Sequence, residues 1–307
     1  MHRRLLIISM SVVMTGCGLW LIYNDESTGF PSYDIAELTE PSGLAASLKN
    51  PGVFWTHNDS GDEARIFAVT AGGALLGEFA VRGASAVDWE AITTDDSGRL
   101  YIADFGNNFN DRQDLVLYTV PEPEVDPLVQ GAGGLIQVEE TIPFHYPDQR
   151  GFPDDEQLDF DAEAIFWAKE KLYVLTKHRS DLSTTLYRLD QTEPTDSVPL
   201  VRISTFEVGG DVNRYGGRVT GADVTSDGRL LAVLCYHALF VFERPEVGDD
   251  YLSRLVNRVD FDQNVTRQTE AIAWDGDALV FTNEGGSIFR IENPLEATTA
   301  LFPSTSD

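Results

Sequence analysis

The stretch EAIFWAKEKLYVLTKH, residues 163–178, holds an acidic, a small and an aliphatic residue in a row, within two short apolar segments that flank a polar turn. The same template begins at five places in the chain: Ser42-Gly43-Leu44, Glu90-Ala91-Ile92, Glu163-Ala164-Ile165, Thr220-Gly221-Ala222 and Glu270-Ala271-Ile272. A third apolar segment follows in each copy: IFAV from residue 66, LYTV from 117, LYRL from 186, VFER from 241 and IFRI from 288. Self-similarity of this kind indicates a fold built from repeated supersecondary units.

The repeated segments have the length of β-strands, and no helix-length amphipathic stretch follows the N-terminal segment. A fourth apolar run follows each of the first four copies, and the fifth copy takes its own from TTALF at residue 298 or from YDIAEL at residue 33. Four short antiparallel strands per unit predict an all-β fold, a single β-propeller of five four-stranded blades over residues 31–307. The long interval between Glu90 and Glu163 leaves room for a sixth blade.

One aromatic ring in each third strand is expected to lie in an equivalent buried position between blades. These rings are Phe67, Tyr118, Tyr187, Phe242 and Phe289.

Residues 1–30 are predicted to be a targeting segment with a short linker, outside the fold. Basic residues precede an apolar run that ends at Thr15-Gly16-Cys17, which resembles a bacterial lipoprotein signal with Cys17 as the acylated residue. The alternative is an uncleaved signal anchor, because Leu5 to Tyr23 is long enough as a helix to span a bilayer. Both interpretations predict an extracytoplasmic protein, anchored to a bacterial membrane by an N-terminal lipid or an anchor helix.

The chain has 307 residues, of which 50 are acidic and 22 basic, for a formal net charge of −28. Such a surface excludes nucleic acid as a partner, because nucleic-acid binding needs a basic footprint. It also repels polyanionic substrates unless a metal ion bridges them. Of the two cysteines, Cys17 lies in the targeting segment and Cys235 in an apolar run, so no intrachain disulfide is expected. We expect a monomer.

Polar residues recur at the start of the first strand and at the end of the second strand of each unit. Because successive blade strands run in opposite directions, these positions share one face of a propeller. The acidic starts are Glu90, Glu163 and Glu270. The strand ends are His57, Asn58 and Asp59, then Asp104 with Asn107, then Lys177 and His178, then Tyr236 and His237, then Asn283 and Glu284. The sequence therefore predicts one acidic rim.

Crowded carboxylates repel one another unless a cation neutralises them, and hard oxygen ligands suit Ca²⁺. The predicted metal ligands are Glu90, Asp104, Glu163 and Glu270. The alternative is a solvated rim, since so acidic a chain has acids on every loop. His57 and His178 are candidate general bases, and Lys177 is suited to an anionic group of the substrate. The predicted ligand-binding residues are Asn58, Asp59, Asn107, Asn283 and Glu284.

Several segments resemble a family of secreted bacterial β-propellers of largely unassigned function. They are WTHNDSGD, DWEAI with IADFGNN, DAEAI with YVLTKH, VTGADVTSDGR and TEAIAW, within residues 36–293. That family is similar to the esterase-like phytase group and, remotely, to the calcium-dependent paraoxonase and gluconolactonase propellers. The resemblance implies a secreted propeller and no particular reaction, since fold alone does not fix function.

Two functions are compatible with these features. The first is a membrane-tethered propeller that binds a small-molecule ligand at its acidic rim with Ca²⁺ and acts as a metal-dependent esterase or phosphoesterase. The alternative is a non-catalytic propeller that recruits a protein or glycan partner. A concave pocket where a base and a cation converge would distinguish the enzyme from the scaffold.

Overall fold

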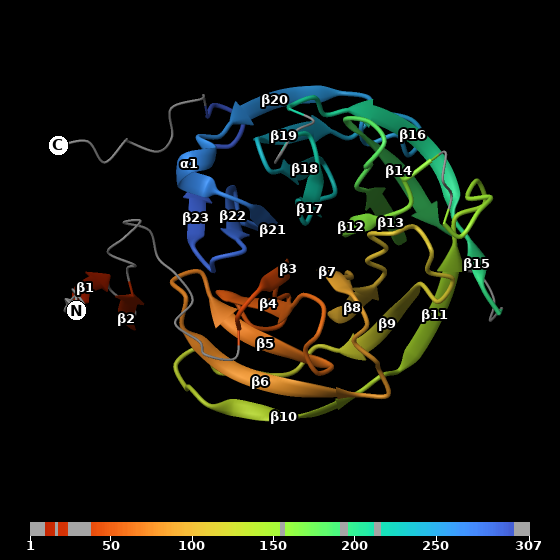
Figure 1. Ribbon diagram of the computed structural model, residues 1–307. Coiled ribbons are helices and arrows are strands. Elements are labelled where there is room, and N and C mark those ends of the chain that lie inside the picture. The colour runs from red at the N-terminus through yellow and green to blue at the C-terminus, as the bar shows by residue number, and fades with distance from the viewer. Residues whose placement is uncertain are drawn as a thin grey trace, which may run out of the picture.

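The computed structural model describes residues 10–15, 18–23, 38–153, 157–190, 196–211 and 216–297. Figure 1 shows five sheets arranged around a central axis, with β3, β7, β12, β17 and β21 nearest to it. The described residues include one short helix, α1 (Gln263–Thr266), beside the last blade. The predicted all-β, five-bladed propeller is therefore confirmed.

Each blade begins at the axis and proceeds outward in chain order. Blade one contains β3 (Pro41–Ala46), β4 (Val53–Asn58), β5 (Arg65–Thr70) and β6 (Leu75–Arg82). Blade two contains β7 (Trp89–Thr94), β8 (Arg99–Asp104), β9 (Val116–Pro121) and β11 (Glu140–His145). Blade three contains β12 (Ala162–Ala168), β13 (Lys171–Thr176), β14 (Ser183–Leu189) and β16 (Val201–Glu207). Blade four contains β17 (Val219–Val224), β18 (Leu230–Cys235), β19 (Ala238–Glu243) and β20 (Leu255–Asp260).

Blade five has three strands within the described residues: β21 (Thr269–Asp275), β22 (Ala278–Asn283) and β23 (Ile288–Ile291). Both segments predicted to supply its fourth strand, residues 33–37 and 298–302, lie outside the described part of the chain.

The sixth blade considered for the interval between Glu90 and Glu163 is wrong. That interval completes blade two and adds β10 (Ala132–Gln137), which pairs in parallel with β6 on the outer edge of blade one. The short β15 (Val198–Pro199) extends blade two in the same way, in parallel with β11. The surplus residues therefore cover the edges of two sheets, where unpaired backbone groups would otherwise be exposed.

The N-terminal segment differs from the helix that the signal-anchor alternative assumes. Strand β1 (Met10–Thr15) pairs antiparallel with β2 (Gly18–Tyr23). β-branched residues such as Val12 and Val13 favour extended backbone. Cys17 lies outside the described residues, so its acylation stays a prediction. Among the helices in the described ranges, none is long and apolar enough to cross a membrane.

A β-bulge occurs at the same place in all five blades. The first two residues of the template lie opposite a single residue of the second strand, as Glu163 and Ala164 do between the Ala162–Thr176 and Ile165–Val174 pairs. The other four first strands have the same irregularity within their template residues. A bulge twists the strand and changes the direction of its side chains. The unpaired residue is the acidic or hydroxyl position of the repeat in four blades. In blade one it is the next residue, Gly43, because Ser42 pairs with His57.

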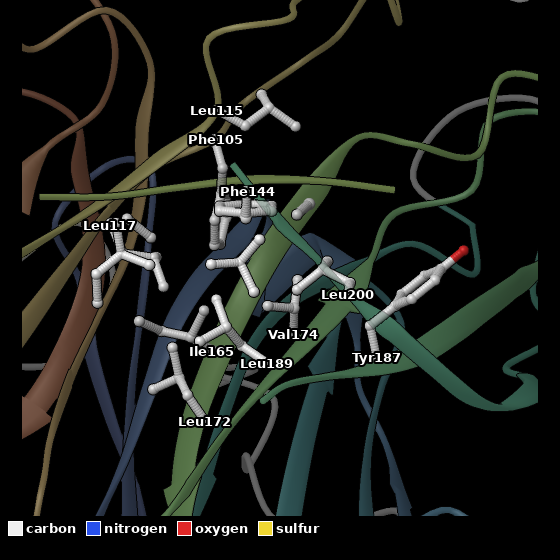
Figure 2. Close-up of a cluster of buried hydrophobic side chains, with 14 of the residues drawn as sticks. Phe105, Leu115, Leu117, Phe144, Ile165, Leu172, Val174, Tyr187, Leu189 and Leu200 are labelled. Atoms are coloured by element: carbon white, nitrogen blue, oxygen red, sulfur yellow. The ribbon is translucent and has the colours of Figure 1, made fainter. Parts of the chain in front are cut away.

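The hydrophobic core consists of five clusters, one at each contact between neighbouring blades. Figure 2 shows the cluster in which Leu117 and Phe144 of blade two meet Ile165 and Val174 of blade three.

The five aromatic rings predicted between the blades are all buried. Four are equivalent in register, since Phe67, Tyr118, Tyr187 and Phe289 pair with corresponding residues of the second strands. The fourth-blade assignment is wrong: Phe240 holds that position, opposite Val233, and Phe242 lies two residues further along. The reason is that only two residues, Tyr236 and His237, connect β18 and β19. This short turn shifts the pairing of β19 with β18 from the alignment that the sequence pattern suggested.

Candidate functional site

The five bulges surround the axis at one end of the propeller. A cavity of about 10 Å³ lies there, lined by template residues from every blade, including Gly43, Glu90, Glu163, Thr220 and Ala271. One water molecule needs roughly 10–15 Å³, so the axis has room for about one small occupant. We call this region the acidic end and define it by its carboxylates: Asp59, Asp88, Glu90, Glu163 and Glu270.

Three of these carboxylates converge. Oxygen atoms of Asp59, Asp88 and Glu90 all lie within 4.8 Å of one another. The backbone of Gly106 closes over two of them: a Cβ at this position would lie 2.3 Å from Asp88 Oδ2 and 2.6 Å from Glu90 Oε1. The approach therefore requires glycine at residue 106. Asp59 and Asp88 are half-buried and Glu90 is buried, so water screens this group only in part.

Burial is the main cause of perturbed acidity in this group. It raises the pKa of Asp88 to about 6, with further contributions from the charges of Asp59 and Asp161. It raises the pKa of Glu90 well above its ordinary value, and the charge of Glu163 acts in the same direction. Such shifts mean that the ionised form of each carboxylate is disfavoured unless a cation neutralises it.

Glu163 has a cation of its own. Lys177 Nζ donates to Glu163 Oε1 at 2.6 Å, both side chains are buried, and the ammonium lies 5.5 Å from the centre of the Tyr236 ring. Burial lowers the pKa of Lys177, but the charges of Glu163 and its neighbours outweigh this and raise the pKa well above its ordinary value. Lys177 is therefore held in its charged form.

Glu270 completes the acidic end from blade five. Its side chain is half-buried and accepts a hydrogen bond from Gln268 Nε2 at 2.8 Å. Burial raises the pKa of Glu270 to about 7, while Lys177 and Gln268 act against the shift and Asp59 adds to it. A carboxyl group with a pKa near 7 can both donate and accept a proton at physiological pH.

The remaining cations of this end are already paired. Arg112 lies 2.9 Å from Asp104 and Arg179 lies 2.6 Å from Asp161. Within the described ranges, no lysine or arginine lies at ion-pair distance from Asp59, Asp88, Glu90 or Glu270. The acidic end thus keeps an excess of negative charge without a protein counter-ion.

Asp104, predicted as a metal ligand, accepts hydrogen bonds from the backbone of the loop before β7. Its oxygens accept from the backbone N–H groups of Val87 at 3.1 Å and Asp88 at 3.0 Å, besides the bond from Arg112. Those bonds hold the segment that presents Asp88 and Glu90. Asp104 is therefore a neighbour of the three converging carboxylates.

His57, predicted as a general base, is fully buried beneath this end. Its Nδ1 lies 2.9 Å from the Asn58 carbonyl oxygen, and Nε2 has no hydrogen-bond partner among the described residues. A Cβ on Gly43 would lie 2.6 Å from that Nε2, so the glycine of the template makes room for the imidazole. Burial lowers the pKa of His57, which keeps the ring neutral.

His178 has both ring nitrogens engaged. Nδ1 lies 2.9 Å from Asp181 Oδ1, and Nε2 lies 3.0 Å from Thr185 Oγ1. Asp159 lies near the same ring, with its Oδ1 3.7 Å from Nδ1. These contacts fix the imidazole within its own loop.

The predicted ligand-binding asparagines also have loop partners. Asn58 donates to Asp62 at 2.6 Å and Asn283 donates to the Thr266 carbonyl at 3.0 Å. Asn107 donates to the Phe160 carbonyl at 3.1 Å and accepts from the backbone of Arg112 at 2.9 Å. Glu284 differs from these residues because it is exposed beside Glu270.

Four residues of this end had no assigned role in the predicted site: Asp88, Asp161, Arg112 and Arg179. The sequence did place Arg179 in a basic cluster with Lys177 and His178. The repeat carried a signal for the first two, because an acid stands two residues before Glu90 and again before Glu163. Arg112 lies in the long β8–β9 connection, and no spacing rule connects it with Asp104.

Comparison with known proteins adds two structural likenesses. The PQQ-bound aldose sugar dehydrogenase of Streptomyces coelicolor has a TM-score of 0.46 and 12% sequence identity, covering 82% of this chain and 94% of that chain. Kuenenia stuttgartiensis hydrazine synthase has a TM-score of 0.46 and 10% identity, covering 90% of each. No family model and no curated protein matches the sequence. The family resemblance therefore stays a prediction, and the chain is defined here as a five-bladed β-propeller with a carboxylate-rich axial end.

Proposed function

We propose that the acidic end binds one divalent cation, Ca²⁺, through Asp59, Asp88 and Glu90. The convergence of these three carboxylates carries the proposal. Calcium–oxygen distances are about 2.3–2.6 Å, so two oxygens on one ion are separated by at most about 5 Å. The spacing of the three carboxylates is compatible with that limit, and a bound cation would supply the missing counter-charge.

We further propose that the cation recruits a small ester or phosphoester, whose carbonyl or phosphoryl oxygen it would polarise. Glu270 is the proton-exchanging group in this proposal. It is half-buried, it forms no ion pair with a lysine or arginine in the described ranges, and burial raises its pKa to about 7. Lys177 adds positive charge near the ligand while it neutralises Glu163. His57 and His178 have no part in the reaction proposed, because one is fully enclosed and the other is held by its loop.

Tethering to a bacterial membrane, with the propeller outside the cytoplasm, belongs to the same proposal. It is supported by the basic residues, apolar run and Cys17 at the N-terminus. An extracytoplasmic protein is exposed to higher Ca²⁺ concentrations than a cytoplasmic one, which suits a site of moderate affinity.

The test is a thermal melt of the full chain in EDTA, Ca²⁺ and Mg²⁺, with a panel of chromogenic esters and phosphates assayed in parallel. Ca²⁺ should raise Tm by mass action, and EDTA should reverse the shift. Asp88→Asn and Glu90→Gln should remove most of the shift, whereas Glu246→Gln, a change at an exposed acid of the β19–β20 connection, should retain it. Equal shifts in all three variants would rule out this cation site. A normal Ca²⁺ shift without turnover of any substrate would favour the non-catalytic alternative.

A further inference from the structure

A second, larger cavity occupies the opposite end of the axis. Its volume is about 500 Å³, within the usual range of small-molecule sites. It is lined where the first strand of each blade ends and the second begins, so all five blades contribute residues. This cavity has no lining residue in common with the 10 Å³ cavity at the bulges.

One carboxylate in the wall of this cavity has no cation. Asp223 accepts backbone hydrogen bonds from Val224 at 2.9 Å and Trp274 at 2.8 Å, and no lysine or arginine of the described residues is at ion-pair distance. The side chain lies deep in the protein yet is only half-buried, because part of it faces the open cavity. Burial raises the pKa of Asp223 to about 7, against the lowering effect of the two hydrogen bonds.

Most other acids of this cavity have an arginine partner. Asp95 pairs with Arg99, Asp227 with Arg229 and Asp275 with Arg290. Asp96 and Asp223 are left without such a partner among the residues described. The single lysine of the lining, Lys169, is exposed and forms no ion pair with either one there.

Two tryptophans are among the lining residues of the same cavity, but Trp274 is buried with 6% of its surface exposed, so Trp167 supplies most of the aromatic surface. Trp167 is half-buried, stacks on Tyr101 with ring centroids 5.5 Å apart, and donates from Nε1 to Asp96 at 3.2 Å. Trp274 donates from Nε1 to the Asp223 carbonyl oxygen at 3.1 Å. Both rings are thus fixed in place next to an unpaired carboxylate. Aromatic faces combined with a carboxylate are the groups that recognise organic cations.

We propose that this second cavity binds a small organic ammonium compound, with Asp223 as its counter-ion and Trp167 as its aromatic wall, while the buried Trp274 holds Asp223 in place. A neutral sugar would also stack on tryptophan, but it would leave the Asp223 charge without compensation. The strong negative charge of the chain favours a cation at either end, and the size of this cavity admits an organic one.

The experiment is a titration of the full chain with choline in EDTA, followed by tryptophan fluorescence and by calorimetry. Its neutral control is 3,3-dimethylbutan-1-ol, the uncharged analogue of choline. We expect saturable binding of choline at least tenfold tighter than that of the alcohol. Asp223→Asn and Trp167→Ala should each weaken choline binding at least tenfold, and Glu246→Gln should leave it unchanged.

Each outcome decides the proposal. Failure of choline and of a second probe, benzyltrimethylammonium, to bind would overturn it, as would equal affinity for choline and the alcohol. Choline affinity that is unchanged in Asp223→Asn, or lowered equally in Glu246→Gln, would indicate non-specific attraction and would overturn it too. Because Asp223→Asn also alters two backbone hydrogen bonds, its Tm is measured first. If that variant is unfolded, Trp167→Ala decides.

Discussion

Lys177 Nζ lies 2.6 Å from Glu163 Oε1 at the acidic end, and both side chains are buried. Glu163 is the bulge residue of blade three, and Lys177 follows the last residue of the strand that pairs with it. The template thus brings an acid and the cation that neutralises it to the axis within one blade. Removal of either partner leaves a buried charge that must be neutralised in another way.

We expect Lys177→Met to lower the free energy of unfolding by about 3 kcal/mol, the low end of the range for breaking a buried pair. Burial raises the pKa of Glu163 to about 8 even though the Lys177 charge lowers it. Without the ammonium this pKa rises further, and keeping Glu163 protonated costs more free energy as pH rises. The loss should therefore be larger at pH 8 than at pH 6 in urea unfolding. The double variant Glu163→Gln/Lys177→Met should recover much of the loss. Strictly additive effects would show that the two side chains do not interact.

Tyr187→Ala should destabilise the chain by about 3–5 kcal/mol, because it removes a buried ring between blades two and three. The Tyr187 hydroxyl also donates to Asp148, at 2.9 Å from Oδ2, so Tyr187→Phe separates that bond from the packing. We expect the phenylalanine variant to lose only about 1 kcal/mol. Phe109→Ala is the matched control, since that ring is 77% exposed, and its effect should be close to zero. Denaturant midpoints at constant m-value measure all three.

The repeat predicted the five-bladed propeller because its template residues mark the first strand of each blade. An acidic or hydroxyl residue, a small residue and an aliphatic residue mark the bulge beside the axis, and Glu90, Glu163 and Glu270 are found there as expected. The position of β10 was not predictable in the same way. Its residues read as part of blade two, and only tertiary pairing with β6 places them on blade one.

The sequence predicted where the acidic end lies, but not which acid forms an ion pair with which basic residue. Alternation of strands is enough to bring the carboxylates of different blades to one end. Which acid receives a cation depends on long-range contacts such as Arg112 with Asp104, and these have no spacing signature. The same holds for His57, whose imidazole occupies space that a side chain on Gly43 would fill.

Stability in EDTA should fall as pH rises from about 6.5 to 8. Burial raises the pKa of Glu270 to about 7 and that of Glu90 further, so the folded chain retains protons that the unfolded chain releases. Stability from such groups is present at low pH and is lost as pH rises through the folded pKa. Burial lowers the pKa of His57 and of His237, which has the opposite effect, but only below about 6.5.

Calorimetric Tm values across this pH window measure the slope. Glu90→Gln should make it shallower, and Glu246→Gln should leave it unchanged. Ca²⁺ should add more to Tm at pH 8 than at pH 6, because protons compete with the cation for the same oxygens. A rising Tm between pH 6.5 and 8 in EDTA would contradict the assignment.

The anchoring prediction is tested at Cys17. If this residue is acylated, Cys17→Ser should abolish fatty-acid labelling and leave an uncleaved precursor in the membrane fraction. Ser11→Ala is a control of similar size within the same segment and should be processed normally. Normal cleavage of the Cys17→Ser protein would refute the lipoprotein interpretation. Absence of both cleavage and fatty-acid labelling in the unaltered protein would favour the uncleaved anchor.

Gly106→Ala tests the cation site without changing any charge. A Cβ at residue 106 would lie 2.3 Å from Asp88 Oδ2 and 2.6 Å from Glu90 Oε1, closer than atoms approach without a shift, so these two carboxylates must move. We expect the Ca²⁺-dependent rise in Tm to fall to less than half. The Tm in EDTA should also fall, because one of the two displaced carboxylates, Glu90, is buried. Gly72→Ala is the matched control, because its added methyl meets only Thr70 Oγ1 at 3.7 Å. If both variants keep the full Ca²⁺ shift, the three converging carboxylates do not hold the ion. A shift lost only in Gly106→Ala would support the site through geometry alone.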